Sequence, residues 1–112
     1  MASQNVTEAT FGEVIESNPV VVLFFGSDWF GPSESFRRVF DAMAPEYPDV
    51  FFAVVDTSEQ EALAAAANVV SIPTLMAYRD QVLVYSEPGV LTATQLSDLV
   101  DAVKAMDMGQ VD

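Results

Sequence analysis

The segment from Val20 to Phe25 is an unbroken run of apolar residues, Val-Val-Val-Leu-Phe-Phe. A strand with one face in water alternates apolar and polar side chains, whereas a run without alternation is typical of a strand covered on both faces. β-Branched and aromatic residues also favour extended backbone. The run therefore predicts a central strand with helices packed on both sides, which restricts the chain to an α/β architecture.

The rest of the chain alternates helical and extended patterns around that strand. We expect helices at 7–18, 33–44, 59–67 and 95–106, and further strands at 3–6, 50–55, 74–78 and 82–85. Thr7 and Thr94 are the expected N-caps of the first and last helices, and Pro32 suits the first position of the second. The order β-α-β-α-β-α-β-β-α predicts a mostly parallel sheet that ends in an antiparallel hairpin, with its turn at 79–81.

Length and composition indicate one domain, residues 1–112, in which 107–112 is expected to be a mobile tail. Half of the residues (51%) are apolar, which is enough for a packed core and unlike a disordered chain. No apolar run approaches the roughly 20 residues that cross a bilayer. Residues 1–5 have no basic region and no apolar run, so they do not form a secretory signal. We expect a cytoplasmic protein.

The charge is strongly negative, with 17 acidic against 4 basic residues and a net charge of −13. Phosphate backbones and anionic membranes would be repelled, so we expect neither a nucleic acid nor a membrane as partner. The acidic surface has two interpretations. It is an adaptation to solubility or to a salty cytoplasm, or it is tuned to a basic partner. The pattern specifies no oligomeric state.

The chain contains no cysteine and no histidine. Disulfides, thiolate nucleophiles and iron–sulfur ligands are therefore excluded, and zinc loses its two usual ligand types. Imidazole acid–base catalysis is excluded as well. We expect no cofactor and no metal.

Two short segments together resemble the active site of the thioredoxin family. The first reads Trp29-Phe30-Gly31-Pro32-Ser33-Glu34, and the second reads Ser71-Ile72-Pro73-Thr74. In that family Trp-Cys-Gly-Pro-Cys opens the long helix, and an Ile-Pro-Thr with a cis proline faces it. The resemblance covers nearly the whole chain and implies the thioredoxin fold. Further landmarks are Phe24-Phe25, Val54-Val55-Asp56, Pro88-Gly89-Val90-Leu91 and a tail, 103–108, like that of actinobacterial thioredoxins.

The resemblance also shows which groups are missing. Phe30 and Ser33 stand at the two cysteine positions, so no functional catalytic residue remains: a phenyl ring cannot attack a disulfide, and a hydroxyl is too weakly acidic without a strong base beside it. The family's buried Asp and its partner Lys correspond to Phe24 and Phe52, which we expect to touch. The proline that kinks the family's helix corresponds to Arg38.

The former substrate groove would consist of Trp29, Phe30, Gly31, Pro32, Ile72, Pro73 and Val90. In the family, backbone beside the cis proline pairs with an extended substrate, a form of strand addition. The resemblance therefore implies a redox-inactive binding or scaffold module with a protein or extended-peptide partner. Alternatively, Phe30 folds back onto its neighbours and the surface is inert.

A rival interpretation is an engineered or variant form of an active thioredoxin, a protein-disulfide reductase of cell redox homeostasis. A designed or reconstructed thioredoxin is a third possible origin. Ser33 with Glu34 and Ser35 could be imagined as a nucleophile with its base, or Ser33 as support for glutathione. Helix capping explains these residues more simply. Arg37 and Arg38 would bind an acidic ligand or, at helical spacing, pair with Asp41 and Glu34.

Overall fold

The computed structural model describes residues 3–27 and 32–106. Within them lies a five-stranded mixed sheet in the order β1-β3-β2-β4-β5. Strands β1 (Gln4–Asn5), β3 (Phe51–Asp56) and β2 (Val20–Gly26) run parallel, whereas β4 (Thr74–Arg79) and β5 (Val82–Pro88) add antiparallel pairings. The predicted α/β order is confirmed.

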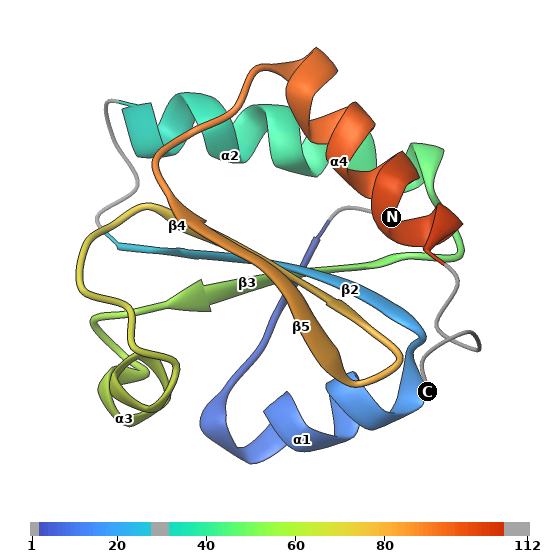
Figure 1. Ribbon diagram of the computed structural model, residues 1–112. Helices are drawn as coiled ribbons and strands as arrows, with labels where there is room; N and C mark the ends of the chain where they lie inside the picture. The colour runs from blue at the N-terminus through green and yellow to red at the C-terminus, as the bar shows by residue number, and fades with distance from the viewer. Residues whose placement is uncertain (1–2, 28–31, 107–112) are drawn as a thin grey trace.

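The helices cover both faces of this sheet (Figure 1). Helices α2 (Pro32–Met43) and α4 (Ala93–Ala105) pack on one face, and α1 (Glu8–Ser17) and α3 (Glu61–Ala66) pack on the other. A single 3-10 turn, η1 (Ala44–Glu46), extends α2 as far as Tyr47. No helix of the described segments is both long and apolar enough to cross a membrane.

The apolar run 20–25 forms the central strand together with Gly26, and every residue of the strand is buried. Its side chains alternate between two cores because successive residues of a strand point to opposite faces. Val22 and Phe24 belong to the core under α2 and α4, and Leu23 and Phe25 to the core over α1 and α3. The prediction of a strand covered on both faces is therefore confirmed.

The N-cap of the last helix is Thr92, so the prediction of Thr94 is wrong. The Thr92 hydroxyl accepts a hydrogen bond from the Gln95 N–H at 3.1 Å, and the Gln95 side chain accepts one from the Thr92 N–H at 2.9 Å. This reciprocal pair is a capping box, whose Thr-x-x-Gln spacing is visible in the sequence. Thr7 is the N-cap residue of α1 as predicted, and its backbone N–H donates to the Thr10 hydroxyl at 3.0 Å.

Other boundaries also differ from the sequence-based expectation; β5, for example, continues to Pro88 instead of ending at 85. Helix α3 begins only at Glu61, because the Asp56 carboxylate accepts hydrogen bonds from the backbone N–H groups of Ser58 (2.9 Å) and Glu59 (3.3 Å) and holds a turn there. The hairpin turn shortens to Asp80 and Gln81, both with positive φ (51° and 72°), as two-residue hairpins of the primed type require. The expected mobile tail, 107–112, lies outside the described residues.

Candidate functional site

The two motif segments lead to the same end of the sheet. Phe25, near the end of β2, pairs with Thr74 at the start of β4, and Gly26 pairs with Asp56 at the end of β3. The chain that leaves β2 and the chain that enters β4 from Pro73 are therefore neighbours. Trp29, Phe30 and Gly31 lie outside the described residues, so their part in the groove stays a prediction.

A backbone hydrogen bond joins the loop before β4 to the loop after β5. The Ile72–Pro73 peptide bond is cis. The Pro73 carbonyl accepts a hydrogen bond from the Gly89 N–H at 2.8 Å, and the Thr74 hydroxyl donates to the Ser71 carbonyl at 2.6 Å. Gly89 has φ +102°, a backbone conformation that favours glycine. Because of these bonds, loops 71–74 and 88–91 form one surface.

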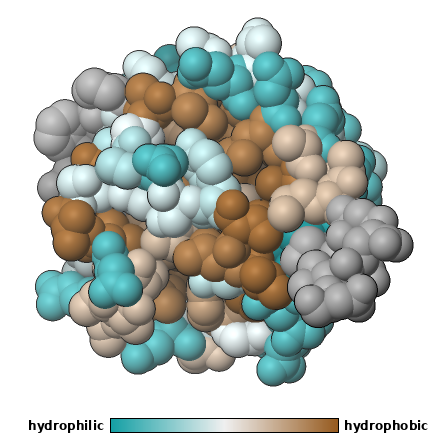
Figure 2. Space-filling model, viewed as in Figure 1, coloured by the Kyte–Doolittle hydropathy of each residue, from teal (hydrophilic) through white to brown (hydrophobic). Residues whose placement is uncertain are grey.

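Large apolar side chains are exposed on this surface. Ile72 and Val90 each keep 45% of their surface accessible, Val70 keeps 95%, and Pro73 between them is half-buried. Figure 2 shows apolar surface at the left of the molecule, over the segment that joins α3 to β4. Neighbouring exposed apolar side chains of this kind are a feature of binding surfaces. Of the predicted groove residues that the structure describes with side chains, Ile72, Pro73 and Val90 come together here.

Beneath this end of the sheet, aromatic rings fill the core under α2. Phe24 is fully buried and Phe52 is 3% exposed. Phe40 lies against both, with ring centroids 5.6 Å from Phe24 and 5.0 Å from Phe52. In the sheet Phe24 is paired with Val54, two residues beyond Phe52 on the same face. The expected direct contact of Phe24 with Phe52 is not among the ring contacts of the described residues, because the ring of Phe40 lies against both.

The charged residues at the start of α2 pair with one another. Arg38 forms an ion pair with Glu34, and the Arg37 Nε atom lies 3.7 Å from an Asp41 carboxylate oxygen. These are the local pairs at helical spacing that the sequence predicts. The carboxylate of Glu34, which a nucleophile hypothesis for Ser33 would need as its base, is already engaged. No group of acidic side chains within the described ranges is arranged to hold a metal ion.

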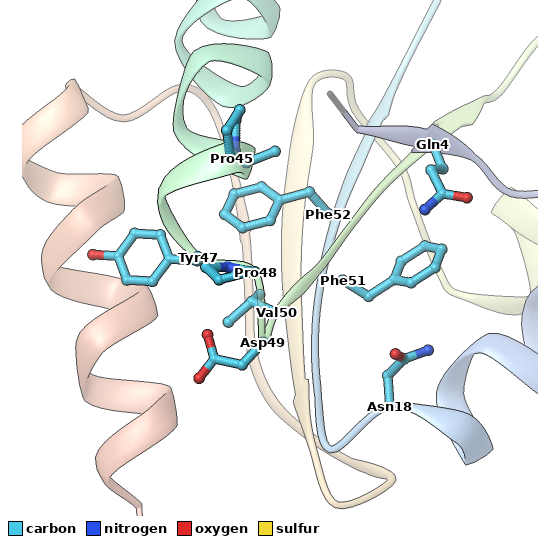
Figure 3. Close-up of a pocket in the computed structure, with 10 residues that line it drawn as sticks. Gln4, Asn18, Pro45, Tyr47, Pro48, Asp49, Val50, Phe51 and Phe52 are labelled. Carbon is cyan, nitrogen blue, oxygen red and sulfur yellow. The ribbon is translucent and has the colours of Figure 1, made fainter. Parts of the chain in front are cut away.

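A separate hollow of about 390 Å³ lies at the opposite end of β3 (Figure 3), about 17 Å from Asp56 at 3.3 Å per strand residue. It is lined by Gln4, Asn18, Ala44, Pro45, Tyr47, Pro48, Asp49, Val50, Phe51 and Phe52. Phe52 is the only one of these that the sequence singled out as a site position.

The polar groups of that hollow connect α4 to the rest of the chain. The Asp49 carboxylate accepts a hydrogen bond from Lys104 at 2.8 Å, which lowers the pKa of Asp49 and raises that of Lys104. The Tyr47 hydroxyl donates to Asp101 at 2.9 Å and lies 2.9 Å from the Ser97 hydroxyl. Tyr47 and Asp49 therefore have a structural role, because their side chains attach α4 to the segment before β3.

Comparison with known proteins identifies the architecture. The thioredoxin family model matches residues 2–102. This chain belongs to the thioredoxin family. It is 37% identical to "Putative thioredoxin 2" of Streptomyces coelicolor over 95% of this chain and 79% of that protein. It is also 37% identical to thioredoxin 1 of Synechococcus elongatus, over 86% of this chain and 92% of that one.

Solved thioredoxin structures superpose on nearly the whole chain. A mutant thioredoxin of Halobacterium salinarum matches with a TM-score of 0.84 and 29% identity, covering 94% of each chain. Thioredoxin f from spinach chloroplast matches with a TM-score of 0.83 at 23% identity, over 93% of this chain and 95% of that one, which shows the fold alone. The thioredoxin fold and the family resemblance predicted from the sequence are both confirmed.

The composition of this chain rules out thiol chemistry. It has no cysteine, so both redox cysteines are absent. Phe24 and Phe52, where the resemblance implies the family's buried Asp and Lys, are buried in an aromatic core. Helix α2 continues as one helix through Arg38, where the resemblance implies a kinking proline. The scaffold is that of a thioredoxin, and the cysteine thiols are missing.

Proposed function

We propose that this chain is a thioredoxin-family binding module without thiol–disulfide activity, which holds an extended segment of a partner protein across its former substrate groove. The groove consists of Trp29, Phe30, Gly31, Pro32, Ile72, Pro73 and Val90. The observation that carries the proposal is the exposure of Ile72 and Val90 on two loops that the Gly89–Pro73 hydrogen bond joins.

The chemistry supports a binding role over a redox role. Thiol–disulfide exchange proceeds by attack of a thiolate on a disulfide sulfur, and this chain supplies no thiol. Replacement of a proton-transferring Asp and Lys by packed rings favours a chain that does not depend on that reaction. The same replacement argues against a variant that differs from an active thioredoxin only at its two cysteines.

The backbone beside Pro73 supports the mode of binding. Among the hydrogen bonds of loops and turns in the described residues, none uses the N–H or C=O of Ile72. An extended peptide can therefore pair with Ile72 by strand addition, with its apolar side chains on Ile72 and Val90. The cytoplasmic location expected from the sequence stays a prediction.

The test is a peptide array of 12-residue segments with fluorescence-polarisation measurement of the tightest binder. We expect Val90→Asp to weaken that binding at least about tenfold, because it places a carboxylate against an apolar contact. Val82→Asp is the matched control, since Val82 is exposed to a similar extent (49%) but lies on the outer strand β5. Equal affinities for wild type, Val90→Asp and Phe30→Asp would refute the groove.

A further inference from the structure

Next to Ile72, on the side of α3, lies a second hollow of about 330 Å³. It is lined by Thr57, Glu61, Ala64, Ala65, Val69, Val70, Ser71 and Ile72. Ile72 is shared with the proposed groove, so a segment that pairs with the backbone at Ile72 passes the mouth of this hollow.

The hollow exists because α3 is rich in alanine. Ala64 and Ala65 present only methyl groups to it, and Val70 and Ile72 form an apolar wall. The one ionisable side chain in its lining is the exposed carboxylate of Glu61. The hollow therefore has mainly apolar walls and a single negative charge.

The basic side chains of this chain already have acidic partners. All four basic side chains form ion pairs: Arg37 with Asp41, Arg38 with Glu34, Arg79 with Asp80 and Lys104 with Asp49. Within the segments that the structure describes, Glu61 belongs to none of these pairs. On a chain of net charge −13 whose four basic side chains pair elsewhere, any cation that pairs with Glu61 would come from a partner.

We propose that this hollow receives a lysine or arginine side chain of the partner segment bound at Ile72. The aliphatic stem would lie along Ala65 and Val70 while its charged head reaches the Glu61 carboxylate, as long basic side chains bury their stems and keep their heads at the surface. This inference rests on the proposed function. It narrows the partner to an extended segment that carries apolar residues and at least one cation.

The test uses the tightest 12-residue binder from the array and variants in which each basic residue is replaced by glutamine. An exposed ion pair contributes little, so we expect one such replacement to weaken binding to wild type about two- to fivefold. The same replacement should have no effect on binding to Glu61→Gln. Raising NaCl from 50 to 500 mM should reduce the difference between the two peptides on wild type.

Glu59→Gln is the matched control. It removes the same charge two residues before Glu61, and the Glu59 side chain lines a different depression. It should retain the wild-type preference for the basic peptide. Ala65→Leu, which fills the hollow without a change of charge, should lose that preference. Thermal melts of each variant report whether α3 remains folded.

The possible failures are distinct. Peptide binding that depends on Val90 but shows no preference for a basic residue, or a preference that survives in Glu61→Gln, would overturn this inference and leave the groove standing. Absence of any peptide binding that depends on Val90 would overturn both proposals together.

Discussion

The ring of Phe24 packs edge-on against the ring of Phe36, with centroids 5.0 Å apart and planes at 76°. Edge-to-face contact is a favoured geometry for aromatic pairs. It joins the central strand to the first turns of α2, immediately after the segment where the family carries its cysteines. Phe24, where the resemblance implies the family's buried Asp, is thus a packing contact for the helix that begins at the proposed groove.

Substitution of Phe24 by aspartate should destabilise the protein strongly. The side chain is fully buried among rings, so Phe24→Asp removes aromatic packing and buries a carboxyl group. We expect the free energy of unfolding to fall by about 3–5 kcal/mol, measured by urea denaturation. Phe24→Leu, which keeps the site apolar, should cost about 1 kcal/mol. A Phe24→Asp protein within about 1 kcal/mol of wild type would show that the ring is not an essential part of the core.

Restoring both cysteines should not restore full thioredoxin activity. The wild-type protein should show no reduction of insulin disulfides by dithiothreitol above the uncatalysed background. Phe30→Cys with Ser33→Cys returns the sulfur atoms but leaves Phe24 and Phe52 without groups that transfer protons. Since acid–base assistance contributes at least about a hundredfold, turnover should be about a hundredfold below that of an active thioredoxin. Full activity in the double variant would disprove this argument.

The turn between β4 and β5 contains a strained residue, and its replacement should stabilise the protein. Gln81 has φ +72°, in a region where side chains other than glycine cost about 1–2 kcal/mol. Gln81→Gly relieves that cost and loses part of the gain to the flexibility of glycine in the unfolded chain. A net stabilisation of about 0.5–1 kcal/mol should appear in thermal or urea unfolding. Gln81→Ala should bring no gain, and an equal gain from both variants would mean that backbone strain is not the cause.

Asp56 should make stability depend on pH in acid. A hydrogen bond from the Ser58 hydroxyl, aided by the N–H groups of Ser58 and Glu59, lowers the pKa of Asp56 in the folded protein. A lowered folded pKa means that the stabilisation is complete above the unfolded value of about 3.9 and is lost as pH falls through the folded pKa.

The stability difference between wild type and Asp56→Asn should therefore be constant from pH 7 to about pH 5 and shrink below about pH 4. Urea unfolding at a series of pH values measures it. Asp98→Asn, at an exposed position on α4, serves as the charge-matched control. A difference that grows as the pH falls would have the wrong sign for a lowered pKa.

The sequence predicted the architecture because its strongest signals were local and agreed with one another. The apolar run 20–25, the proline at the start of α2 and the hairpin each specify one element, and their order leaves few ways to arrange a sheet. Boundaries differ where a side chain competes with the helix backbone. The Asp56 turn delays α3, and the last helix is capped at Thr92 rather than at the predicted Thr94 because Gln95 completes a reciprocal bond with Thr92.

Only part of the proposed groove has an observed geometry. Ile72, Pro73 and Val90 lie on adjoining loops, because the strand register brings these loops to one end of the sheet. The hollow beside α3 was not anticipated. The hollow forms because the short alanine side chains leave space between α3 and the neighbouring loop. A run of alanines in the sequence does not show whether such a space is filled by other residues. The role of Phe40 between two rings likewise needs the angle of α2 on the sheet.

The most direct measurement is a titration of ¹⁵N-labelled protein with the tightest array peptide, followed by amide chemical shifts. The account predicts that shifts concentrate at 71–74 and 89–91, whereas Asn18, Val50 and Phe51, around the opposite hollow, remain unchanged. Shifts confined to the end of the sheet that carries Asn18 and Phe51, or none at saturating peptide, would contradict the claim that this thioredoxin scaffold binds its partners where its catalytic relatives carry their sulfur atoms.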